Sequence, residues 1–147
     1  MSTLKKEECS GDNVENNKKW SESVESLLEC DNGRHRFLQF LTKRNLVEGE
    51  RTILFWESLN DFQKLLKEET DKNTILKKKK SVIDYADEYV NFTREENQQL
   101  AKIMDEEDKE SVHEILENAK KTASGLIGLE YQIFMAWLEM DQYENAY

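Results

Sequence analysis

Apolar residues recur at helical spacing along most of this chain. The first set, Trp20, Val24, Leu27 and Leu28, occupies positions i, i+4, i+7 and i+8. This spacing places the four side chains on one face of a helix. Asp31-Asn32-Gly33 follows and predicts a turn, because glycine adopts positive φ at little cost. A second apolar stripe after the turn predicts another helix and consists of Phe37, Phe40 and Leu41.

A polar segment then interrupts the pattern from about Lys43 to Arg51, and we expect a loop that breaks at Gly49. Thr52 is the expected N-cap of the long helix that comes next, because its hydroxyl can accept a hydrogen bond from an amide of the first turn. The inward residues of that helix are predicted to be Phe55, Trp56, Leu59, Phe62, Leu65 and Leu66.

The second half of the chain continues in the same way. A helix is predicted from about Asn73 to Val90, and Thr93-Arg94-Glu95-Glu96 matches a capping box at the start of a short helix. After the acidic break 105–108, a further helix is predicted to end at Ser124-Gly125, and a last apolar helix covers 126–138. Because no alternating strand pattern occurs, we predict an all-α fold.

The first 17 residues differ in composition from the remainder. Their apolar side chains are Leu4, Cys9 and Val14, among mostly charged and polar residues. Such a segment buries too little apolar surface to offset the entropy of ordering, so we expect a mostly disordered tail over 1–17. Residues 18–147 form the predicted domain. Lipidation of Cys9 is a weak alternative use of the tail.

Charge and cysteine content limit the function. The 147 residues carry a formal net charge of -10, which argues against nucleic-acid binding. Cys9 and Cys30 do not make a disulfide framework, and His35 and His113 lack ligand spacing, so no metal site and no cofactor are expected. The N-terminus has no signal-peptide core, and we expect a cytoplasmic protein.

Lys77-Lys78-Lys79-Lys80 is a basic run within this acidic chain. Contact with anionic lipid is one interpretation, worth about 1 kcal/mol per lysine near such a surface. Consecutive residues point around a helix, however, which favours a solvated helix face.

The order of these motifs, from Lys19-Trp20 through Phe37-Leu38-Gln39-Phe40-Leu41 to Ile53-Leu54-Phe55-Trp56, resembles the opening of a regulator of G-protein signalling (RGS) domain. Val90-Asn91-Phe92 is similar to the family's fifth-to-sixth helix junction. Glu139-Met140-Asp141-Gln142-Tyr143 resembles its Glu-x-Asp-Ser-Tyr signature. The resemblance covers about 18–143.

Several expectations follow from the resemblance alone. It implies about nine helices in two subdomains, one an antiparallel four-helix bundle and the other containing both chain ends. It also implies binding to an activated heterotrimeric G-protein α subunit (Gα), in its GTP or transition-state-like form, and acceleration of GTP hydrolysis. The catalytic residues would belong to Gα, so the chain itself is not expected to be an enzyme. We expect a monomer, recruited in some settings to the inner face of the plasma membrane.

The resemblance also implies which residues contact Gα. Three regions contribute, and they comprise Glu50, Arg51, Thr52, Asn91, Trp137, Asp141, Gln142 and Asn145. Asn91 and Asp141 match the family's residues. Arg51 and Thr52 stand where an acid followed by Asn is usual, Gln142 replaces Ser, Trp137 replaces Leu, and Asn145 replaces Arg.

These residues also have structural interpretations. Trp20, Phe37, Trp56, Phe62 and Trp137 are expected to be core residues first. Asn91 could simply cap or turn the chain, and Asp141 could be the N-cap of a short final helix. The alternative function is an RGS-like scaffold without GTPase activation that binds another partner.

Overall fold

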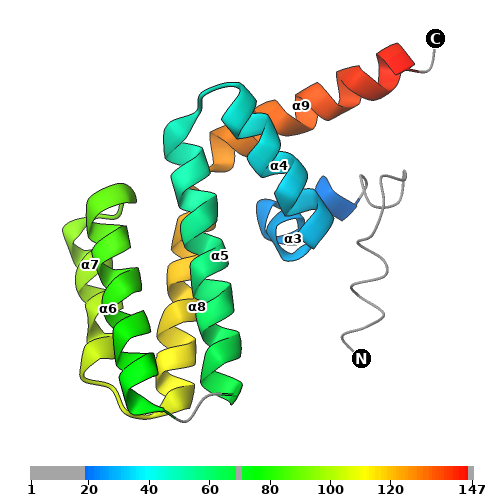
Figure 1. Cartoon of the computed structure of the whole chain (residues 1–147). Helices are drawn as coiled ribbons and strands as arrows, with labels where there is room; N and C mark the ends of the chain where they lie inside the picture. The colour runs from blue at the N-terminus through cyan, green and yellow to red at the C-terminus, as the bar shows by residue number, and fades with distance from the viewer. Residues whose placement is uncertain (1–18, 69–70, 146–147) are drawn as a thin grey trace. The chain divides into compact units, whose positions relative to one another are not determined.

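The computed structural model describes residues 19–68 and 71–145, with side chains as far as 140. The described part of the chain contains helices and no strand, so the all-α prediction is confirmed. Seven α-helices and one 3₁₀ helix follow in order (Figure 1): α3 (Val24–Glu29), α4 (Asp31–Lys43), α5 (Val47–Glu68), α6 (Lys72–Tyr89), α7 (Arg94–Ala101), η1 (Lys102–Met104), α8 (Lys109–Leu126) and α9 (Gly128–Asn145).

The described residues form two compact units. One unit, residues 51–126, contains most of α5 together with α6, α7, η1 and α8; we call it the bundle unit. The other, called the terminal unit, combines 19–50 with 127–145 and contains α3, α4 and α9. In the bundle unit, successive helices run in opposite directions, so the beginning of α5 lies at the same end as the end of α6 (Figure 1).

A single apolar core holds the bundle unit together. Its residues come from all four helices and from η1, and they are completely or almost completely buried: Phe55, Leu59, Phe62, Leu66, Val82, Ala86, Val90, Phe92, Leu100, Ile103, Val112, Leu116, Ala119 and Ala123. Burial of each large side chain contributes about 1.5–3 kcal/mol. Four of the six residues predicted to face inward on α5 belong to this core: Phe55, Leu59, Phe62 and Leu66.

Aromatic rings dominate the terminal unit. Phe37 of α4 stacks on Phe134 of α9, with ring centroids 4.9 Å apart, and Phe40 lies 5.2 Å from the same ring. Trp20 is fully buried, and its carbonyl oxygen accepts a hydrogen bond from the Tyr131 hydroxyl. This bond connects the first described residues of the chain to α9. Such a unit forms only when both parts of the sequence come together.

Four expectations about turns and helix ends are wrong. Asp31, Asn32 and Gly33 form the first turn of α4 instead of a turn between helices. A Cβ at Gly33 would lie 2.8 Å from atoms of Trp20 and Leu27, so the glycine permits close packing. Asp141 is not the N-cap of a further helix, because its backbone lies within α9.

The predicted loop around Gly49 is also wrong. α4 ends at Lys43 and α5 begins at Val47, so Gly49 lies inside a helix. The chain turns instead at Asn45, which has a φ of 58°. Thr52 therefore lies past the first turn of α5 and is not its N-cap.

The predicted capping box is confirmed. The Thr93 hydroxyl accepts a hydrogen bond from the Glu96 amide at 3.1 Å, and the Thr93 amide donates to the Glu96 carboxylate at 2.8 Å. The two bonds satisfy amides that would otherwise lack partners at the start of α7. This motif fixes the chain direction immediately after Asn91.

Among the described residues, no helix combines the length and the hydropathy that a membrane span requires.

Candidate functional site

Two of the predicted contact residues, Arg51 and Asn91, belong to the same end of the bundle unit, where α5 begins and α6 ends (Figure 1). Arg51 begins the bundle unit's part of α5, and its guanidinium carbon lies 4.9 Å from the centre of the Tyr89 ring in the last turn of α6. The Tyr85 hydroxyl donates a hydrogen bond to the Arg51 carbonyl oxygen at 3.1 Å. Asn91 follows Tyr89 by two residues. We call the surface of Arg51, Tyr85, Tyr89 and Asn91 the junction face.

A rigid base supports the junction face. The Phe55 ring is stacked in parallel with Tyr85 at 6.0 Å and meets Phe92 edge-on at 5.5 Å. Phe55 is fully buried and Phe92 is nearly so. Each aromatic pair adds about 0.5–1.5 kcal/mol beyond its buried area. The segment that carries Asn91 is therefore fixed on the side of Phe92 and by the capping box after it.

The Asn91 side chain is exposed. The turn at this position is made by the backbone, because the Phe92 amide donates to the Val90 carbonyl at 2.8 Å. The helix cap comes from Thr93. Within the part of the chain that the structure describes, the Asn91 side chain makes no hydrogen bond. The structural interpretation of Asn91 as a side-chain cap is therefore wrong, and its amide is available to a partner.

Thr52 does not belong to this surface. Its side chain is only 4% exposed, unlike that of Arg51, and its contact with a partner stays a prediction. Helix geometry explains the difference, because neighbouring residues of α5 point in different directions and Arg51 takes the exposed one.

The remaining predicted residues belong to the terminal unit. Glu50 is half-buried there. Trp137 is also half-buried, and its ring lies 5.2 Å from Phe40, so it has a packing role. The side chains of Asp141, Gln142 and Asn145 lie outside the described residues, and the structure gives only their place in α9.

Sequence reasoning missed a buried polar cluster between α5 and α8. The Lys120 ammonium group donates to Asn60 at 3.1 Å and to Gln63 at 2.9 Å, and it lies 4.6 Å from the centre of the Trp56 ring. Gln63 donates in turn to Glu117 at 3.1 Å. Desolvation raises the pKa of Glu117, but the Gln63 bond and the Lys120 charge outweigh it, so the pKa lies below its ordinary value. From the sequence alone, only one contact of this cluster could be predicted: Glu117 and Lys120 are three residues apart and therefore neighbours on one helix face.

The lysine run is not a uniform solvated face. Lys79 is 8% exposed and donates to the Glu106 carbonyl at 2.9 Å, and Lys78 donates to Ser58 at 3.2 Å. Lys77 and Lys80 are exposed. A lipid contact through all four lysines would require two of these side chains to leave their positions, so the run does not act as one patch.

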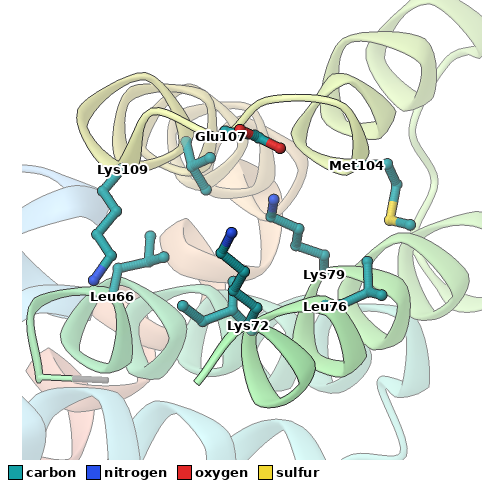
Figure 2. A pocket seen from close by; sticks show the side chains of 9 residues that line it. Leu66, Lys72, Leu76, Lys79, Met104, Glu107 and Lys109 are labelled. Carbon is teal, nitrogen blue, oxygen red and sulfur yellow. The ribbon is translucent and has the colours of Figure 1, made fainter. Parts of the chain in front are cut away.

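Lys79 also lines a pocket of about 390 Å³ at the opposite end of the bundle unit from the junction face. In Figure 2, the nitrogen atoms of Lys72 and Lys79 point toward Glu107, and Lys109 contributes a third ammonium group. The apolar floor comes from Leu66, Ile75, Leu76, Met104 and Val112. The lining could hold a small group that is both apolar and anionic.

No cluster of three or more potential metal ligands occurs among the described residues. Cys30 is buried, with 1% of its surface exposed.

Comparison with known proteins points to a class of signalling domain. A 64-residue stretch of this chain is 38% identical to the human protein "Regulator of G-protein signaling 10". The matched stretch covers 44% of this chain and 32% of the human protein, so the match spans about a third of that relative's length. No family model and no solved structure matches the chain. The similarity hints at an RGS-like domain and extends over less than half of the chain.

Proposed function

We propose that this chain is an RGS-like domain that binds an activated Gα subunit and accelerates its GTP hydrolysis. The partial similarity to the human regulator supports the family. The two compact units, one of which draws on both halves of the sequence, also fit the expected arrangement of helices. The observation that carries the proposal is Asn91, an exposed amide on a rigid turn with no structural partner among the described residues.

The mechanism requires no catalytic group from this chain. Binding accelerates hydrolysis when the domain holds the hydrolysis-competent arrangement of the Gα switch loops more tightly than the ground state. A preference of about 1.4 kcal/mol corresponds to a tenfold acceleration. The Asn91 amide can both donate and accept hydrogen bonds, which suits backbone and side-chain groups of a mobile loop. Arg51 places a positive charge on the same face.

Single-turnover GTP hydrolysis with a panel of Gα subunits tests the proposal, together with binding to their GDP–aluminium-fluoride forms. We expect acceleration with at least one subunit. Asn91→Ala should reduce that acceleration at least tenfold and change the melting temperature little, because the side chain makes no internal hydrogen bond. Asn73→Ala is the matched control, since Asn73 is exposed near the start of the same helix, α6. It should leave the acceleration unchanged.

A second candidate is an RGS-like scaffold that binds a different partner. The burial of Thr52 favours it, because the side chain at one of the expected contact positions is only 4% exposed. Absence of both acceleration and binding across the Gα panel, with a folded protein, would refute the first candidate and leave the scaffold. An equal loss of activity in Asn91→Ala and Asn73→Ala would remove the junction face from the proposal.

A further inference from the structure

α9 carries a row of exposed apolar side chains along one side. Leu129 is 68% exposed, Ile133 39% and Met140 64%, and Ala136 is also exposed. The four residues are separated by four, three and four positions. This is the spacing of the a and d positions in a coiled-coil heptad, with Ile133 and Met140 at a and Leu129 and Ala136 at d. We call this row the α9 seam.

The seam is separate from the core of the terminal unit. α9 already packs through Phe134 and Leu138, which are 0% and 5% exposed. Phe134 contacts the rings of Phe37 and Phe40 on α4. α9 is therefore apolar on two sides, only one of which the unit covers. An apolar face of this extent is typical of a helix that packs against a further element.

The charge of α9 selects the kind of partner. Between Gly128 and Asn145 the sequence contains four acidic residues, Glu130, Glu139, Asp141 and Glu144, and no lysine, arginine or histidine. Glu139 is exposed at a g position that flanks the seam, whereas Glu130, at an e position, is half-buried beside Gly49. A second copy of α9 would bring acidic residues together beside the seam, in a chain whose net charge is already -10. A helix with basic flanks would instead meet opposite charges.

We propose that the α9 seam binds an amphipathic helix of a partner protein, with apolar residues at heptad spacing and lysine or arginine on both flanks. This inference goes beyond the proposed function, because Asp141 and Asn145 occupy the b and f positions, away from the seam. Trp137 borders the seam at an e position. The seam belongs to the terminal unit, and the junction face belongs to the bundle unit.

Two designed peptides test the proposal against the full chain. Both carry three heptads with Ile at a and Leu at d; one has Lys at every e and g position, and the other has Glu there. Like-charge repulsion keeps each peptide from associating with itself. Fluorescence anisotropy should show binding of the basic peptide, at least tenfold weaker binding of the acidic peptide, and weakening by salt.

Variants locate the binding. Leu129→Ser combined with Met140→Ser should weaken binding of the basic peptide at least tenfold without loss of helix content. The matched control combines Leu54→Ser with Leu76→Ser, two exposed apolar residues of the bundle unit, and should bind as the parent does. Equal affinity for both peptides, no binding of the basic peptide, or unchanged binding by the seam variant would overturn the proposal.

Two further outcomes would assign the seam to another occupant. Sedimentation that shows a dimer, abolished by Leu129→Ser with Met140→Ser, would make a second copy the partner. Binding of the basic peptide only after removal of residues 1–18 would show that this segment covers the seam. Either result would contradict the proposal that a partner helix with basic flanks occupies the seam in the full chain. Because none of these assays includes Gα, failure of the proposed function would not affect them.

Discussion

Replacement of Gly33 by alanine should destabilise this protein, although the same change inside a helix is ordinarily favourable. Gly33 lies in the first turn of α4. An added Cβ would lie 2.8 Å from Trp20 Cε2, Trp20 Nε1 and Leu27 Cδ1. Non-bonded carbon atoms prefer about 3.5–4.0 Å, so at least one neighbour must move. Both Trp20 and Leu27 are fully buried, which leaves little room for that movement.

The two opposing effects can be compared in magnitude. Insertion of a methyl group into a packed core costs about 1–3 kcal/mol. The helix gains about 0.5–1 kcal/mol when alanine replaces glycine. We therefore expect a net loss of about 1 kcal/mol for Gly33→Ala, within a range of about 0–2.5 kcal/mol. For a chain of this size, a loss of about 1 kcal/mol lowers the melting temperature by about 2–4 °C.

Gly125 provides the matched control. It lies in the last turn of α8, and no atom would come within 4 Å of an added Cβ. Gly125→Ala should stabilise the protein by up to about 1 kcal/mol. Urea unfolding followed by circular dichroism gives both values, with unchanged m-values as the condition for comparing midpoints. A stabilised Gly33→Ala variant, similar to Gly125→Ala, would refute the close-packing explanation of this glycine.

Two further substitutions test contacts within the bundle unit. Thr93→Ala removes the hydroxyl that accepts from the Glu96 amide and should cost about 1 kcal/mol in urea unfolding; an unchanged midpoint would contradict the capping role. Glu117→Gln tests the lowered pKa of Glu117. A carboxyl group whose pKa is lower in the folded state stabilises the protein at pH values above its ordinary pKa of 4.5, and this stabilisation disappears as the pH falls through the folded-state pKa. The parent should therefore be more stable than the variant at neutral pH, and the difference should vanish in acid; a difference independent of pH would exclude ionisation as its cause.

Local patterns in the sequence were enough to predict most of the helices. The helix predicted over 73–90 is found at Lys72–Tyr89, and the Thr93–Glu96 capping box has both of its hydrogen bonds. The helix and the capping box are each determined by residues a few positions apart, so the local sequence is enough to predict them. The glycines were misread because their reason lies elsewhere in the fold: Gly33 lies against Trp20, and a Cβ at Gly49 would come within 3.2 Å of Glu130.

The candidate site was predictable to a smaller degree. Asn91 was singled out by the resemblance of Val90-Asn91-Phe92 to the family's fifth-to-sixth helix junction. The contact between Arg51 and Tyr89 could not be predicted, because it depends on how α5 and α6 pack within the bundle unit. The cluster around Lys120 was missed for the same reason, since Asn60 and Gln63 are far from Lys120 in the sequence. Both contacts are formed by packing between helices, and the spacing of residues along the chain does not predict that packing.

The two departures from the family pattern at the start of α5 have unequal weight. Thr52 is buried, so packing constrains the identity of its side chain. Arg51 is exposed, and its guanidinium group lies against the Tyr89 ring, two residues before Asn91. A partner that meets this end therefore faces a positive charge where the family usually presents an acid. Because like charges across an interface cost several kcal/mol, the proposed function requires a Gα surface that is less basic at this point than one that pairs with an acid. Of the two departures, Arg51 is thus the one that restricts the choice of partner.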